Sequence, residues 1–115
     1  MTTTSVEQLV SLFTDCAVAW GYCYSSGKIK HAEPFADDLS EIHTALREAT
    51  AGSDQPLIEL MYATEHPWVK HCSAAILLKN SPENAVLVLE QLSSQTGLWA
   101  TMSEACLGVW RQKQK

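Results

Sequence analysis

The sequence has little of what marks a membrane-spanning or secreted protein. No apolar run approaches the roughly 18 residues that a membrane-spanning helix needs. The start of the chain, Met-Thr-Thr-Thr-Ser, lacks the basic and apolar regions of a secretory signal. The four cysteines stand apart, without a C-x-x-C pair, which is typical of small buried residues in a reducing compartment. We therefore expect a soluble cytoplasmic protein with no membrane partner.

The sequence also lacks a cluster of residues that points to catalysis or to a cofactor. His71 and Cys72 are adjacent, so on a helix their side chains point about 100° apart and cannot act as a base and its nucleophile. A zinc site built from His31, His43, His66 or His71 would need ligands from separate helices, because local pairs at zinc-finger spacing are missing. The sequence predicts neither an enzyme nor a bound metal or cofactor.

No stretch alternates between apolar and polar residues as a half-buried strand does. The apolar run 85–89 would fit a buried strand, but it has no alternating partner, so we assign it to a helix. Pro56, Pro67 and Pro82 each suit the first turn of a helix, where the missing N–H costs nothing. Prolines therefore mark the joints between helices in the second half of the chain.

Apolar residues recur at spacings of three and four in six segments, which predicts six helices. The first helix begins at a capping box formed by Thr4 and Glu7 and ends at Ser25-Ser26-Gly27. The second begins at Lys28 or at Pro34, which is either an early-turn residue or a kink, and ends at Thr50. The remaining helices are expected over residues 56–64, 67–79, 82–92 and 98–112.

The helix over 67–79 is predicted to be the central one, buried on more than one side. Val69, Cys72 and Ile76 form its main apolar stripe, and Ser73 is expected in solvent. Ile76 is expected to contact helices on both sides. Two further faces are predicted to be buried: Phe35, Leu39, Ile42, Leu46 and Ala49 in the second helix, and Trp99, Met102, Ala105, Cys106, Val109 and Trp110 in the last.

Six helices with short connections are expected to form three stacked antiparallel hairpins in a single domain over residues 1–115. The spacing between Pro56 and Trp99 lies within the roughly 40–47 residues of a HEAT or armadillo unit. The predicted fold class is therefore all-α, an armadillo/HEAT-like right-handed superhelix.

The residues also support a family resemblance. The segments AEPFADDL, HPWVK and SPENA, with the late Trp110, resemble a small bacterial family catalogued as a domain of unknown function. The sequence departs from that family in having Lys70 where Arg is usual and in placing Pro34 within the second helix. The resemblance implies a compact armadillo-like superhelix and no particular chemistry.

Charge is unevenly distributed along the chain. Residues 33–65 hold eight acidic residues and one basic residue, Arg47. On the second helix Glu33, Asp37, Glu41 and Glu48 recur at spacings of four, four and seven, opposite the apolar face. Like charges four residues apart cost roughly 0.2–0.5 kcal/mol per pair, so this stripe lowers stability without a local benefit. Either the stripe is only a solvated face, or it binds a basic partner.

We predict a partner-binding surface made of five acidic residues: Glu33, Asp37, Asp38, Glu41 and Glu48. Such a surface repels phosphates, which disfavours a nucleic-acid partner, and attracts basic proteins. The expected function is a non-catalytic protein-binding module, most concretely an immunity protein that neutralises a basic nuclease toxin. The alternative is a structural or regulatory adaptor that assembles with itself or with another chain.

Overall fold

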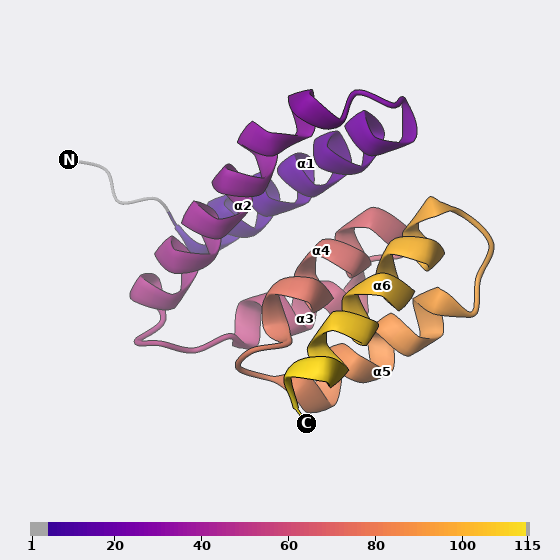
Figure 1. Ribbon diagram of the computed structural model, residues 1–115. Coiled ribbons are helices and arrows are strands. Elements are labelled where there is room, and N and C mark those ends of the chain that lie inside the picture. The colour runs from indigo at the N-terminus through magenta and orange to yellow at the C-terminus, as the bar shows by residue number, and fades with distance from the viewer. Residues whose placement is uncertain (1–4, 115) are drawn as a thin grey trace.

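The computed structural model describes residues 5–114, which form six helices and no strand (Figure 1). The all-α prediction is therefore confirmed. None of the helices in this range combines the length and apolar character that a membrane span requires. The helices are α1 (Val6–Ser25), α2 (Ile29–Ala49), α3 (Gln55–Ala63), α4 (Pro67–Leu77), α5 (Pro82–Ser93) and α6 (Leu98–Lys113).

The helix starts show which sequence signals act locally. Pro67 and Pro82 are the first residues of α4 and α5, as predicted. The capping box of α1 lies one residue later than predicted: the Gln8 N–H donates to Ser5 Oγ at 3.1 Å, and the Ser5 N–H donates to Gln8 Oε1 at 2.9 Å. Thr4, the expected cap, lies outside the described residues. Pro34 lies inside α2, which begins at Ile29, so it does not start the helix.

The helices pack mainly against their neighbours in the sequence. The pairs α1–α2, α3–α4 and α5–α6 lie side by side, which confirms the predicted packing between neighbouring helices (Figure 1). Helix α4 also contacts α1, α5 and α6, so four helices surround it. The prediction that the helix starting at Pro67 is central and buried on more than one side is confirmed.

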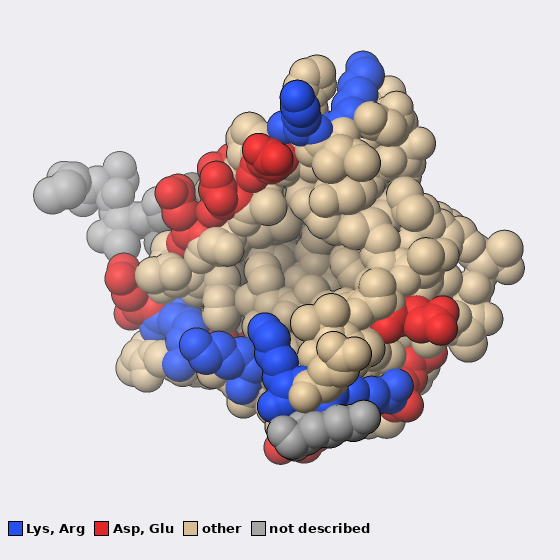
Figure 2. Space-filling model, in the orientation of Figure 1, with Lys and Arg blue, Asp and Glu red and all other residues tan. Residues whose placement is uncertain are grey.

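In the same orientation, the space-filling view shows a hollow on the face between α2 and α6 (Figure 2). Helix α4 lies between these two helices and forms the base of the hollow. Most of the residues that line this hollow are apolar.

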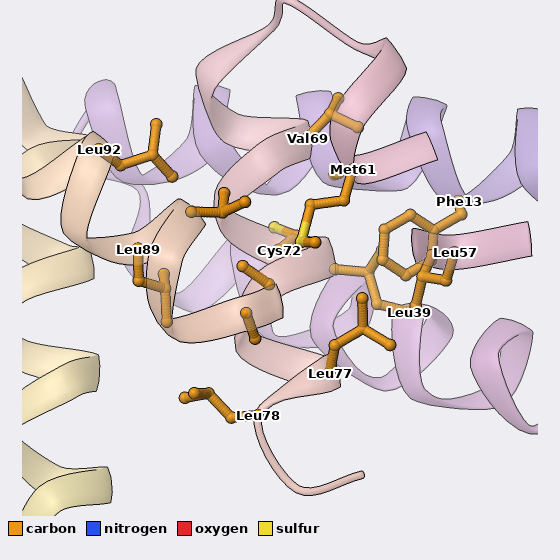
Figure 3. Packing of buried hydrophobic residues seen from close by; sticks show 14 of the residues in the cluster. Phe13, Leu39, Leu57, Met61, Val69, Cys72, Leu77, Leu78, Leu89 and Leu92 are labelled. Carbon is orange, nitrogen blue, oxygen red and sulfur yellow. The ribbon is translucent and has the colours of Figure 1, made fainter. Parts of the chain in front are cut away.

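The core lies where α4 meets the surrounding helices. Figure 3 shows Phe13, Leu57, Met61 and Leu89 converging around Cys72 of α4. The side chains of Phe13, Met61 and Leu89 have no exposed surface. Helices α3, α4 and α5 have 9, 11 and 12 residues, too few to be stable alone in water, so this shared core stabilises them.

Two predicted positions in the helices are wrong. Ser73 is fully buried rather than solvated, because its hydroxyl donates to the Val69 carbonyl at 2.7 Å and so has a hydrogen-bond partner inside the helix. Ile76 is half-buried and packs against the core, and Leu77 next to it is fully buried. Ala49 is exposed at the end of α2.

The buried face of α6 also differs from the prediction. Ala100, Ser103 and Leu107 are the buried residues, whereas Val109 is 56% exposed and Ala105 is exposed. Apolar residues occupy two adjacent sides of this helix, and the buried side packs against α5 and α4. The larger side chains of Trp99, Met102, Cys106 and Trp110 are left half-buried along its edge.

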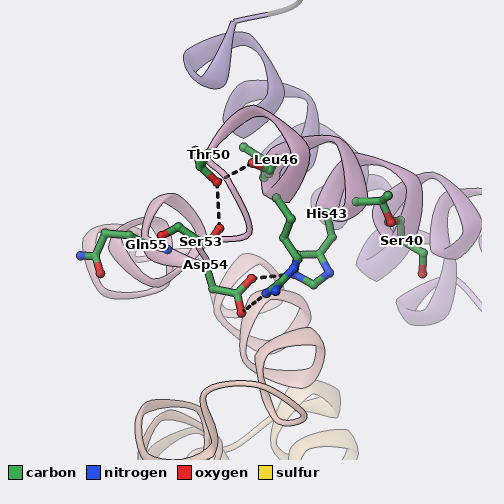
Figure 4. Close-up of polar contacts among 9 residues, drawn as sticks. Ser40, His43, Leu46, Thr50, Ser53, Asp54 and Gln55 are labelled. Atoms are coloured by element: carbon green, nitrogen blue, oxygen red, sulfur yellow. Dashed lines mark hydrogen bonds and ion pairs between the residues drawn. The ribbon is translucent and has the colours of Figure 1, made fainter.

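Asp54 joins α2 to α3 in a way that its sequence position did not predict (Figure 4). An aspartate directly before a helix often caps it, but the Asp54 carboxylate makes no capping hydrogen bond to α3. Instead it binds His43 Nε2 and Arg47 Nη1 of α2, both at 2.9 Å. Desolvation raises the pKa of Asp54, but the hydrogen bonds and charges of His43 and Arg47 lower it by more, so the net pKa lies below its usual value.

Candidate protein-interaction site

Four of the five predicted binding residues form a row along α2. Glu33, Asp37, Glu41 and Glu48 are all exposed. A step of four residues turns a helix by only about 40° beyond a full turn, so their side chains leave α2 on one side. We call these four residues the acidic rim. Figure 2 shows the acidic side chains gathered over α2, along one edge of the hollow.

Asp38 does not belong to this row. It follows Asp37 by one residue, so its side chain leaves α2 about 100° away from that of Asp37. It lies instead close enough to α1 to affect Cys16. Burial, Asp38 and Asp15 together raise the pKa of the Cys16 thiol. Asp38 is exposed, but it does not contribute to the surface that the other four form.

The acidic rim is not neutralised within the described part of the chain. None of its carboxylates takes part in an ion pair there. Arg47, the only basic side chain between residues 33 and 65, is bound to Asp54. The rim therefore presents four carboxylates to solvent that make no ion pair among these residues.

The hollow beside the rim consists of two connected pockets. A pocket of about 220 Å³ lies between α2 and α4 and is lined by Trp20, Leu39 and Ile76, among others. A pocket of about 720 Å³ lies between α4 and α6 and is lined by Leu78, Val109 and others. Ala75 of α4 lines both pockets, so they meet there. We call the joined pockets the trough.

The far edge of the trough is basic. Lys79, just beyond α4, and Lys113, at the end of α6, both line the larger pocket and are exposed. Figure 2 shows basic side chains along the lower edge of the hollow, below the acidic row, with a surface that carries neither in the middle of the hollow. Other basic side chains lie at the upper end of the acidic row. The trough therefore has an apolar floor, an acidic edge on α2 and a basic edge at the ends of α4 and α6.

A buried polar pair beneath the trough connects α4 to α6. His71 Nδ1 and Ser103 Oγ share a hydrogen bond of 2.9 Å, and both residues are buried. The His71 ring stacks on Trp20, with ring centroids 5.7 Å apart. Burial lowers the pKa of His71 to about 4, so the ring is neutral at pH 7. Sequence reasoning missed this pair, because residues 32 positions apart gave no local signal.

The buried cysteine next to this histidine is a packing residue. Burial raises the pKa of the Cys72 thiol to about 12, so the thiol is protonated at neutral pH and is a poor nucleophile. Cys72 is in contact with the main core. Within residues 5–114 no three histidine, cysteine, aspartate or glutamate side chains are placed so that they could hold a metal ion together.

The tryptophans also pack beside this pair. Trp20, Trp68 and Trp99 form edge-to-face contacts, with centroid distances of 5.4 Å and 6.2 Å on either side of Trp68. Trp68 is the most buried of the three. This arrangement favours hairpin packing over a ligand cage, since the rings fill the space between one another.

Comparison of the chain with protein-family models, curated proteins and solved structures gave no match. The resemblance to a small bacterial family therefore stays a prediction. What the chain does has to be argued from the surface described above.

Proposed function

We propose that this protein is a non-catalytic protein-binding module whose acidic rim docks a basic partner. The observation that carries the proposal is the row of four exposed carboxylates on α2, none of which is paired within the described residues. Like charges at this spacing repel one another and lower the stability of the isolated helix. A partner that neutralises them relieves this repulsion, which favours binding. A one-sign surface of this kind also speeds encounter with a partner of opposite charge.

In its most concrete form, the partner is the basic domain of a nuclease toxin, and the protein is its immunity protein. Nuclease sites are basic because they hold phosphates, and an acidic rim matches them in charge. We further propose that the three hairpins form a short armadillo/HEAT-like right-handed superhelix. The packing of α1 with α2, α3 with α4 and α5 with α6 in sequence order supports it.

The alternative is an adaptor that stacks end to end with another chain. Stacking needs an apolar end surface. The exposed side of α5, at one end of the order of hairpins, carries Glu83, Glu90 and Gln91 around a single exposed apolar residue, Leu87. This mostly polar surface favours docking through the acidic rim over stacking at that end.

The proposal is tested with two charge-reversed variants that change the net charge equally. Asp37→Lys/Glu41→Lys alters the acidic rim, and Glu65→Lys/Glu104→Lys alters exposed carboxylates elsewhere. The partner is captured from host extract by the wild type and purified, and its Kd for all three proteins is measured at two salt concentrations. We expect the first variant to bind at least about tenfold more weakly and to lose most of the salt dependence.

The control variant should bind nearly as well as the wild type. Equal weakening by both variants would mean that only net charge matters, and unchanged binding by the rim variant would contradict the proposal. Far-ultraviolet circular dichroism checks that each variant keeps its helices, which we expect because exposed substitutions usually change stability by no more than about 0.5 kcal/mol.

A further inference from the structure

The trough exposes apolar surface that no part of the described chain covers. Its floor is formed by Ala36 and Leu39 of α2, Ala75 and Ile76 of α4, and Val109 and Trp110 of α6. Val109 is 56% exposed, and Ile76 and Trp110 are only half-buried. A partner that places apolar side chains here would bury this surface, which is the main favourable term in association.

The walls of the trough determine which backbone conformation can lie in it. The trough is formed mainly by three helices, α2, α4 and α6, and the N–H and C=O groups within a helix are already bonded to one another. An extended segment placed on this floor would bury its own backbone groups without partners, because there is no strand edge among residues 5–114 to pair with. A helix satisfies its backbone groups internally, so a helix is the segment that fits.

The two edges set the orientation and the charges of that helix. One edge is the acidic rim on α2, and the other carries Lys79 and Lys113. A helix in the trough would place one flank of its apolar stripe near each edge. Basic side chains would match the first flank, and acidic side chains would match the second.

We propose that the trough binds an amphipathic helix of the partner protein, with Lys or Arg on the flank facing α2 and Asp or Glu on the flank facing Lys79 and Lys113. The apolar stripe of that helix would lie over Ala75, whose small side chain lets the helix approach α4 closely. This inference rests on the proposed function and specifies the partner segment that the acidic rim selects.

The probe for this proposal is a displayed library of random 16-residue peptides selected against the purified protein. We expect enriched peptides to carry apolar residues at positions i, i+3 or i+4, and i+7, with basic residues on one flank. Replacing a central residue of an enriched peptide by proline should weaken it at least about tenfold, because proline breaks the helix.

Two exposed apolar residues of the protein provide a matched pair of variants. Val109→Gln changes the trough floor, and Leu87→Gln changes α5 outside the trough. The two side chains are similarly exposed, Val109 at 56% and Leu87 at 58%. We expect the first to weaken peptide binding about tenfold and the second to leave it within about twofold. Both replace an exposed residue, so both variants should stay folded.

The outcomes separate this proposal from the one on which it rests. One outcome would contradict helix binding in the trough and still support the acidic rim. In it, the enriched peptides are basic but lack the apolar repeat, and neither proline nor Val109→Gln weakens their binding. Asp37→Lys/Glu41→Lys, in contrast, abolishes it. Peptides that none of these variants affects would overturn both. A library that yields no enriched peptide would overturn the trough as a helix-binding site.

Discussion

At the scale of single residues, Gly21 determines how closely α1 approaches α4. It lies inside α1 and is buried. A Cβ atom at this position would overlap the indole ring of Trp68, which is itself 5% exposed. Gly108 in α6 is the opposite case, because a Cβ atom there would meet nothing within 4 Å. The two helical glycines therefore differ only in what surrounds them.

Gly21→Ala should lower the free energy of unfolding by about 1–3 kcal/mol, since the indole has to move in a packed core. Gly108→Ala should raise it by roughly 0.5–1 kcal/mol, because alanine is the better helix former and has room. Urea unfolding of both variants measures the difference. Two changes of the same sign would show that Trp68 does not fill the space beside Gly21.

The ionisation of His71 is coupled to folding. Its pKa is lowered by burial to about 4 from its ordinary value of 6.5. Between these two values the unfolded chain binds a proton that the folded chain does not, so stability falls as the pH falls. The loss begins near pH 6.5 and is complete near pH 4. Over that range it amounts to roughly 3 kcal/mol.

His71→Gln should remove this dependence while keeping a group that can bond to Ser103. The measurement is the unfolding free energy of the wild type and the variant at several pH values between 4 and 7. The difference between the two curves isolates His71 from the carboxylates that titrate in the same range. Parallel curves would mean that His71 is protonated as easily in the folded chain as in the unfolded one.

At the scale of elements, α4 holds the molecule together. It packs against α1, α3, α5 and α6. Lys70 Nζ donates to the Met61 carbonyl near the end of α3 at 3.2 Å, and His71 bonds to Ser103 of α6. Within α4, Leu77 is fully buried and Ile76 borders the trough. Adjacent residues of the same helix therefore serve the core and the surface.

Leu77→Ala should cost about 2–5 kcal/mol of unfolding free energy, as a fully buried leucine does. Ile76→Ala should cost less, about 1–2 kcal/mol, because part of its side chain is already exposed. Thermal or urea unfolding of the two variants gives the comparison. An equal or larger cost at Ile76 would place that residue, rather than Leu77, at the centre of the core.

The six helices and the central place of α4 could be predicted because proline positions and three-four spacing are local signals. The buried side of α6 could not, because Ala100 and Ser103 are less apolar than Trp99 and Val109 yet small enough for close approach to α4. The exposed row on α2 was predictable from spacing alone. Asp38 could have been excluded by the same helical geometry, whereas the trough depends on where α2 and α6 lie over α4.

At the scale of the whole molecule, one face combines charges of both signs with apolar surface. The acidic rim, the trough and the two lysines at its far edge lie together there (Figure 2). The exposed side of α5 is mostly polar. An interaction surface that combines an apolar floor with charges of opposite sign at its edges supplies both affinity and orientation.

Amide hydrogen exchange of the protein with and without its captured basic partner shows directly which face binds that partner. We expect binding to slow exchange in α2, in the last turn of α4 and in the second half of α6, where the acidic rim and the trough lie. Helices α3 and α5 should exchange at nearly unchanged rates. Protection confined to α3 and α5, with α2 and α6 unaffected, would contradict the central claim that this face binds the partner.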